Sequence, residues 1–276
     1  MNPAFTKKDL KEMVEQCSTL GIDSIAGKIY ADLSMKNRVG AGQGWCWDDT
    51  GDDFPKLNPL LVDRDSTFIP QFVELLQEKG IGVQGTDYAV CPEDAQMLAF
   101  NSTTLRSLIP LCLKTSDNLF AESILYQLGK KDGVPFAETK VSLEYVRKLL
   151  QEVCPDNDGC SIVDGSGLSF YNMMTPNALF GLLKYIYKSE YFSEIRGALP
   201  IAGQDGTLQK RFKKTPAEQR LFAKTGSISG TSALAGYALS SNSHMLIFVM
   251  MNDGVPRGQS AQARELQDQL CMIMCE

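Results

Sequence analysis

The sequence predicts a mixed α/β fold of the α+β type, with a layer of helices against an antiparallel sheet. Three strand-like segments follow one another through short turns, at residues 220–227, 231–240 and 245–251. Short turns between consecutive strands favour antiparallel pairing. Apolar residues at helical spacing precede and follow these strands, at 175–189 and 260–274. A sheet with helices packed on it is the simplest way to bury both sets of apolar residues.

The N-terminal part predicts two further helices and two strands. Residues 6–20 have helical spacing, with Thr6 as a plausible N-cap and Gly21 as the end. Residues 22–33 alternate as a strand does. The remaining predictions here are a long loop rich in Gly, Asp and Asn, a helix stopped by a Gly-Ile-Gly turn, and a short strand, at 38–59, 67–79 and 97–100.

Between these regions the sequence predicts helices broken by a short polar segment. Residues 104–114 read as a helix, and Thr115-Ser116-Asp117-Asn118 interrupts it with residues that favour caps and turns. A second helix follows, with Glu122 in its first turn. Residues 139–153 form another predicted helix, and the helix at 175–189 has Pro176 at its first position.

Composition excludes several function classes. The 276 residues carry 27 basic and 33 acidic side chains, a net charge of -6, and the basic residues are scattered, so nucleic acid is not an expected partner. The chain has a single histidine, so we expect neither a metal centre built from Cys/His clusters nor a Ser-His-Asp catalytic triad. We therefore predict no cofactor and no metal.

Eight cysteines form no metal-ligand pattern. Cys154 and Cys160 flank a turn-rich loop that a small disulfide would close, and their redox state is left open. For most of the eight, a buried free thiol is the favoured interpretation.

Two short motifs carry the chemistry: Ser116-Asp117-Asn118 between two helices, and Lys224-Thr225-Gly226 on a strand. Taken singly, the first is explained by a helix cap and the second by a surface lysine. Together, in this order and these contexts, they match two of the three elements of serine β-lactamases and penicillin-binding proteins.

The residue types fit that chemistry. Residues two apart in an extended loop point the same way, so we expect Ser116 and Asn118 to face one cavity, the hydroxyl relaying a proton and the amide holding a peptide carbonyl. Alternation puts Lys224 and Gly226 on one side of their strand. The lysine attracts a terminal carboxylate, and the glycine leaves room for a peptide along the strand. Thr225 lies between them, and Ser227 adds a hydroxyl for the carboxylate.

The surrounding sequence resembles the D-alanyl-D-alanine carboxypeptidase/endopeptidase family, the class C low-molecular-mass penicillin-binding proteins. Residues 163–169 (Val-Asp-Gly-Ser-Gly-Leu-Ser) are similar to its glycine-rich segment. The resemblance is carried in addition by residues 44–49, 62–64, 114–122, 175–176, 199–208, 223–227 and 236–237.

The resemblance implies a β-lactamase/transpeptidase-like fold, an antiparallel sheet flanked by helices, here with an incomplete N-terminal part. Residues 1–95 are expected to be a small α/β remnant of the segment between the first and second motifs, and residues 96–276 the transpeptidase-like domain. Ser116, Asn118 and Lys224 are the expected catalytic residues. The expected substrate-binding residues are Thr225, Gly226, Ser227, Asp164 and Ser166. The implied ligands are peptidoglycan stem peptides and β-lactams.

The sequence departs from the family in two places. Phe170 stands where a basic residue is expected after the glycine-rich segment. The larger departure is the first motif, Ser-x-x-Lys, because no serine among the 276 residues has a lysine three positions later. Without that nucleophile the usual acyl-enzyme cannot form.

Three explanations are open: an expressed fragment, half of a split enzyme, or a non-catalytic homologue that binds peptidoglycan. A fragment is favoured, because the N-terminus also lacks the apolar core of a secretory signal, although the family implies a periplasmic or other extracytoplasmic location. Such a chain is expected to expose apolar surface, which predicts either a homodimer formed through that surface or poor stability. We therefore expect a serine-type D-Ala-D-Ala carboxypeptidase or endopeptidase domain that is inactive as this chain stands. A scaffold without a ligand site is disfavoured because both motifs are present.

Overall fold

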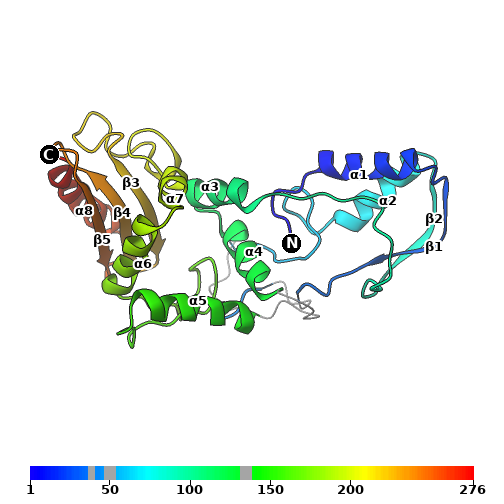
Figure 1. The fold of residues 1–276 in the computed structure, drawn as a ribbon, viewed down its shortest axis with the longest axis horizontal. Helices are drawn as coiled ribbons and strands as arrows, with labels where there is room; N and C mark the ends of the chain where they lie inside the picture. The colour runs from blue at the N-terminus through cyan, green and yellow to red at the C-terminus, as the bar shows by residue number, and fades with distance from the viewer. Residues whose placement is uncertain (37–40, 47–53, 131–138) are drawn as a thin grey trace. The chain divides into compact units, whose positions relative to one another are not determined.

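A computed structural model describes residues 1–36, 41–46, 54–130 and 139–276. Their contacts define two compact units, whose elements are labelled in Figure 1. Unit 1 comprises Met1–Thr104, Leu119–Tyr145 and Asp164–Ser166, and unit 2 comprises Leu105–Asn118, Val146–Val163 and Gly167–Glu276. The assignment of residues 1–95 to a remnant between two motifs stays a prediction.

The two predicted helices of unit 1 are present. Helix α1 (Lys7–Thr19) begins with a capping box, in which the Thr6 side chain accepts from the Asp9 N–H and the Thr6 N–H donates to Asp9 Oδ2 at 2.8 Å. Helix α2 (Phe68–Glu78) contributes Leu75 and Leu76 to the same buried cluster as α1. The predicted N-cap at Thr6 is therefore confirmed.

The strands of unit 1 were predicted only in part. Strand β1 (Ser24–Ala31) confirms the alternation seen there, and it pairs in parallel with β2 (Gly82–Tyr88), which was missed. Strand β2 is polar and mostly exposed, so its sequence lacks the alternation that would reveal it. Pairing with β1 holds it instead.

The predicted strand at 97–100 is wrong. That segment has no regular structure, and Met97 and Phe100 expose 73% and 66% of their surface. Among the residues that the structure describes, no strand pairs with it, and an unpaired strand has no ladder to stabilise it. Residues 38–40 and 47–53 of the predicted long loop lie outside the described residues.

Unit 2 contains the predicted antiparallel sheet, in the order β3-β4-β5 (Figure 1). The strands are β3 (Leu221–Ile228), β4 (Thr231–Leu239) and β5 (Met245–Asn252). The register pairs Lys224 with Ala235 and Leu234 with Met250. The middle strand is therefore β4, and β3 and β5 are the edges.

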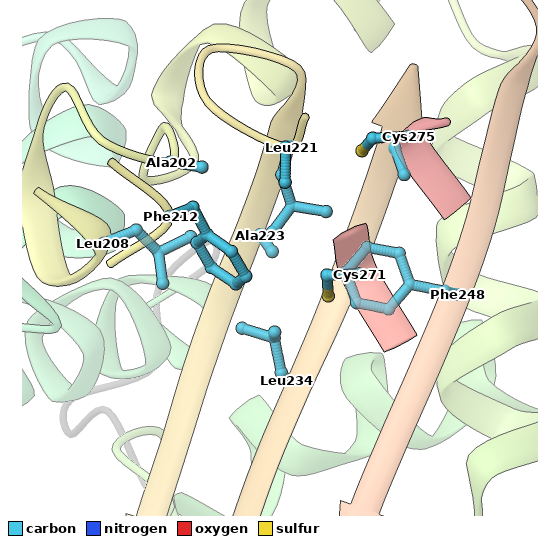
Figure 2. Close-up of a cluster of buried hydrophobic side chains, with 11 residues drawn as sticks. Ala202, Leu208, Phe212, Leu221, Ala223, Leu234, Phe248, Cys271 and Cys275 are labelled. Carbon is cyan, nitrogen blue, oxygen red and sulfur yellow. The ribbon is translucent and has the colours of Figure 1, made fainter. Parts of the chain in front are cut away.

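Helices cover both faces of this sheet. Leu234 of β4 packs in one buried cluster with Cys271 of α8 (Ser260–Cys275) (Figure 2). Ala238 of β4 belongs to the same cluster. Ala235 and Tyr237 point to the other face, toward α6 (Pro176–Lys188), whose Leu183 belongs to the same buried cluster. Period-two alternation thus divides β4 between two cores, as the fold prediction requires.

The other helices are α3 (Leu105–Thr115), α4 (Asn118–Gly129), α5 (Thr139–Val153) and α7 (Phe192–Ala198), with a 3₁₀ turn, η1 (Gly206–Leu208). The first three were predicted, as was α6, whose Thr175 side chain caps the Ala178 N–H. The short α7 and η1 were missed because one or two turns carry too little periodicity to detect.

All eight cysteines carry free thiols, Cys154 and Cys160 included. Only Cys271 and Cys275 are buried, so the prediction of buried thiols for most of them is wrong. The others are half-buried or, for Cys91, exposed. Within the described ranges, no helix is long and apolar enough to cross a membrane.

Candidate active site

Ser116 ends helix α3 in a left-handed conformation. Its φ is 58°, and the Asp117 N–H donates to the Cys112 carbonyl at 3.0 Å. This six-to-one bond is the Schellman motif, whose left-handed position is usually glycine because a Cβ is strained there. A serine in that place suggests that the hydroxyl is retained for a reason other than folding.

The prediction of an extended loop through Ser116 and Asn118 is therefore wrong. Ser116 is left-handed, and Asn118 is already the first residue of α4. The Schellman closure of α3 leaves no room for an extended segment between the two helices. Both residues still belong to unit 2, where Ser116 is exposed and Asn118 half-buried.

Lys224 of β3 contacts Ser116 directly. Its Nζ donates to Ser116 Oγ at 2.5 Å and to the Thr225 carbonyl at 2.8 Å. Phe222 and Lys224 are two residues apart on β3, so their side chains lie on the same face of the sheet. Phe222 packs in the cluster of Ala235 and Tyr237, which places Lys224 on the face opposite α8. Burial of the ammonium lowers the pKa of Lys224, a shift toward the range in which an amine exchanges protons.

The outer edge of β3 is covered at one end only. The Ala202 N–H donates to the Leu221 carbonyl and the Ala223 N–H to the Pro200 carbonyl, both at 3.0 Å. By alternation, Thr225 and Ser227 turn their backbone groups toward the same edge. In the described part of the chain no backbone group outside the sheet bonds to those of Thr225 and Ser227, and the Thr225 carbonyl accepts only from the Lys224 side chain. The edge beside Lys224 is thus open to an extended peptide.

Gly226 is not required by the sheet itself. A Cβ built there would touch only the Ala233 Cβ, at 3.4 Å, and the backbone of Gly226 is not left-handed. Gly226 and Ser227 are both exposed. Because packing and backbone conformation would tolerate a side chain, the glycine is explained better by space for a ligand at the strand.

A loop missed by sequence reasoning holds the two motifs together. Lys114 Nζ, near the end of α3, donates to both Asp205 carboxylate oxygens, at 2.9 and 2.7 Å, and to the Leu199 carbonyl at 2.6 Å. Asp205 Oδ1 also accepts from the Ile201 N–H at 2.8 Å. Two residues beyond Asp205, Thr207 Oγ1 accepts from Thr225 Oγ1 at 2.9 Å. The loop 199–208 therefore links α3 to β3.

Gly206 allows the loop to approach α3 so closely. Its φ is +56°, and a Cβ there would lie 2.5 Å from the Lys114 carbonyl oxygen. The sequence signal was available, since residues 199–208 resembled a family block, but nothing in that block alone predicted its contacts.

Asp164 and Ser166 lie in unit 1, where Glu122 holds their turn. Glu122 Oε1 accepts from the N–H groups of Gly165 and Ser166 at 3.0 and 2.8 Å. Asp164 Oδ2 accepts from the Trp45 indole N–H at 3.0 Å, and the carboxyl is buried. A substrate contact by Asp164 or Ser166 stays a prediction.

Burial governs the ionisation of Glu122. The residue is 1% exposed, and its desolvation raises the pKa of the carboxyl above its ordinary 4.5 in spite of the two N–H donors. Gly165 is needed in this turn, because a Cβ would lie 2.9 Å from the Ala121 carbonyl oxygen.

The arrangement in unit 2 suits a peptide with a free carboxylate. It offers an ammonium, hydroxyls at Ser116, Thr225 and Ser227, and an open strand edge. No group of three or more His, Cys, Asp or Glu that would hold a metal ion occurs among the described residues. His244 is exposed just before β5.

Comparison with known proteins identifies a family. The model of the D-Ala-D-Ala carboxypeptidase 3 (S13) family matches residues 2–69 and 61–275. The chain is 29% identical over 230 residues to penicillin-sensitive carboxypeptidase A of Dictyostelium discoideum, covering 78% of this chain and 43% of the relative. It is 31% identical over 170 residues to D-alanyl-D-alanine carboxypeptidase DacB of Haemophilus influenzae, covering 60% of this chain and 36% of the relative. The matched part is less than half of either relative.

Solved structures share the fold. The crystal structure of penicillin binding protein 4 (dacB) from Haemophilus influenzae gives a TM-score of 0.81 at 21% identity, covering 98% of this chain and 80% of that one. The same protein has also been solved in complex with a novel beta-lactam. The predicted transpeptidase-like fold is therefore confirmed.

The strain at Ser116 gives a first prediction. Ser116→Gly and Ser116→Ala both remove the hydroxyl, but only glycine relieves the left-handed backbone. We expect the glycine variant to be more stable than the alanine variant by about 1 kcal/mol in urea unfolding. The matched pair at the exposed helical Ser107 of α3 is expected to give the opposite order, by a similar amount. Equal stabilities at position 116 would contradict a left-handed Ser116.

Glu122 gives a second prediction. Because its folded pKa is raised, its contribution to stability is fully present below its ordinary pKa and is lost as the pH rises through the folded value. Glu122→Gln keeps the single oxygen that accepts both N–H groups and removes the charge. We expect the free energy of unfolding of the wild type to fall, relative to that of the variant, as the pH rises above about 4.5. Parallel pH curves would show that Glu122 ionises normally.

Proposed function

Because this chain belongs to the D-Ala-D-Ala carboxypeptidase 3 (S13) family, we propose that it forms the substrate-recognition part of a serine-type carboxypeptidase or endopeptidase acting on peptidoglycan stem peptides. The observation that carries the proposal is the hydrogen bond from Lys224 to Ser116 beside an open strand edge.

The substrate lies along β3 in this proposal. An acyl-D-Ala-D-Ala terminus extends the sheet, pairing with the outward backbone groups of Thr225 and Ser227. Its carboxylate is held by the Lys224 ammonium and by the hydroxyls of Thr225 and Ser227, and Gly226 leaves space for the peptide. Asn118 donates its amide to the substrate carbonyl. Asp164 and Ser166, which lie in unit 1, stay candidate substrate-binding residues.

Ser116 and Lys224 together form a proton relay. The lysine donates to the Ser116 oxygen, so the hydroxyl proton of Ser116 is directed to another acceptor. In hydrolysis that acceptor is the leaving amine, and the lysine then returns a proton to the serine oxygen. The lowered pKa of Lys224 favours this return.

We further propose that these 276 residues alone form no acyl-enzyme. No serine among them has a lysine three positions later, and Ser116 is oriented by Lys224 as a relay rather than as a nucleophile. β-Lactams and stem peptides then bind without turnover. The alternative is a homologue that binds peptidoglycan as its whole function, which the same open edge would serve.

The proposal also covers location and partners. Peptidoglycan lies outside the cytoplasmic membrane, so an extracytoplasmic location follows from the proposed substrate. A homodimer is the proposed assembly of the chain.

The test combines two measurements on the purified chain. Intact-mass spectrometry after exposure to a fluorescent penicillin is expected to show no adduct, whereas calorimetry is expected to show binding of an acyl-D-Ala-D-Ala peptide. Lys224→Met should weaken peptide binding by about tenfold or more, the loss of one charge-assisted hydrogen bond. Lys213→Met, in an exposed loop, is the matched control and should leave binding unchanged.

Each outcome has a definite meaning. A stoichiometric penicillin adduct would overturn the claim of inactivity, and mapping it would name the nucleophile. Absence of peptide binding, or equal binding by the Lys224→Met variant, would overturn the proposed recognition site.

A further inference from the structure

Thr207 lies on the turn η1, and its hydroxyl group contacts strand β3. The oxygen accepts from Thr225 Oγ1 at 2.9 Å. Within the described ranges the Thr207 side chain makes no other hydrogen bond. A hydroxyl group has one hydrogen to donate and two lone pairs that accept. Since Thr225 uses its hydrogen on Thr207, the hydrogen of Thr207 is the one that remains for a new acceptor.

The fold fixes the position of Thr207 without using its side chain. On one side Gly206, with its left-handed backbone, lies against the Lys114 carbonyl. On the other side Leu208 is fully buried, and its carbonyl accepts from the Gly203 N–H at 3.1 Å. Thr207 itself is exposed. Because its neighbours hold the turn, the hydroxyl group at position 207 is explained better by a ligand than by packing.

The two threonines and Lys224 approach the edge of β3 from opposite faces of the sheet. Alternation places the Thr225 side chain on the face of Ala223, which packs in the cluster against α8. Leu208 belongs to the same cluster, so the turn that carries Thr207 lies on that face. Lys224 lies on the other face. A carboxylate at the strand edge therefore meets an ammonium from one face and a pair of hydroxyl groups from the other.

The direction of the bond between the threonines decides what Thr225 offers to such a carboxylate. A carboxylate only accepts hydrogen bonds, and Thr225 already donates its hydrogen to Thr207. Each hydroxyl hydrogen rotates about a single C–O bond, so the bond reverses without movement of either oxygen. Thr207 then donates to Thr225 Oγ1, and Thr225 donates to the carboxylate. Hydrogen bonds in such a chain polarise and strengthen one another.

We propose that Thr207 is a positioning residue for the terminal carboxylate of the substrate and acts through Thr225. In the free protein the bond runs from Thr225 to Thr207. When the carboxylate binds, the chain of donors runs from Thr207 to Thr225 to the carboxylate. The inference rests on the proposed function, because the carboxylate is that of the acyl-D-Ala-D-Ala terminus. It extends the recognition of the free carboxylate to a residue outside both motifs.

A peptide with a terminal amide separates this role from a purely structural one. The amide carries N–H groups of its own, and these donate to the Thr225 oxygen while Thr225 still donates to Thr207. Binding of the amide therefore needs no reversal. Thr207 is expected to favour the acid over the amide, whereas a residue that only held the loop in place would affect both peptides equally.

Calorimetry with the acyl-D-Ala-D-Ala peptide and its terminal amide tests the proposal on the full chain. Thr207→Val removes the hydroxyl group and nearly keeps the shape of the side chain. We expect this variant to bind the acid about fivefold more weakly, the net loss of one hydrogen bond, and to bind the amide as the wild type does. Thr207→Ser keeps the hydroxyl group and should restore binding of the acid.

Two further variants serve as controls. Thr231→Val, at the start of β4, also removes a threonine hydroxyl group, one that donates to Asp253 Oδ1 at 2.9 Å. It should leave the affinity for both peptides unchanged. In a Thr225→Val background the change Thr207→Val should have no further effect on the acid, because Thr207 acts only through Thr225. Circular dichroism will show that each variant folds.

The outcomes separate this inference from the proposed function. If the wild type binds the acid and Thr207→Val binds it equally well, the inference is overturned and the proposed function stands. Equal losses for acid and amide, or losses at positions 207 and 225 that simply add, would overturn it as well. A wild type that binds no acid peptide would overturn the proposed function and this inference with it.

Discussion

The hydrogen bond between Lys224 and Ser116 is the contact on which the site depends. It joins the end of a helix to an edge strand, and it requires Ser116 to stay in a left-handed conformation that serine resists. The Schellman closure of α3 imposes that conformation, and the Lys114–Asp205 ion pair fixes the same helix end to the loop beside β3. The ion pair is partly buried, and its second carboxylate oxygen is also used by a backbone N–H, so it acts as a brace rather than a surface contact.

Three glycines show which positions need a glycine for folding and which does not. At Gly206 and Gly165 a Cβ would strike a backbone carbonyl oxygen, so the fold alone requires glycine at both positions. At Gly226 the surroundings would accept a side chain. The absence of a side chain at Gly226, two residues after Lys224, is therefore explained better by space for a ligand than by folding. This supports the open β3 edge as a binding surface.

The sequence predicted the elements that have strong hydrophobic periodicity or a helix cap. It did not predict elements that depend on contacts with residues far away in the chain. Thr6, Thr175 and the alternation of β4 each act locally, so helices α1 and α6 and the two-sided sheet were predictable. Strand β2 exists because β1 lies beside it, and residues 97–100 fail to form a strand for want of a neighbour.

The site followed the same rule. The side of β3 on which Lys224 lies was predictable from the alternation of the strand. The left-handed conformation of Ser116 and the ion pair of Asp205 with Lys114 depend on contacts between segments far apart in the chain. No local pattern encodes such contacts, although the block at 199–208 marked where they would lie.

The most direct test of this account is a crystal structure of the chain with an acyl-D-Ala-D-Ala peptide. The account predicts an extended peptide paired with Thr225 and Ser227, its carboxylate within hydrogen-bond distance of the Lys224 ammonium. A peptide bound elsewhere, with the β3 edge empty and the Lys224–Ser116 bond unaltered, would contradict it.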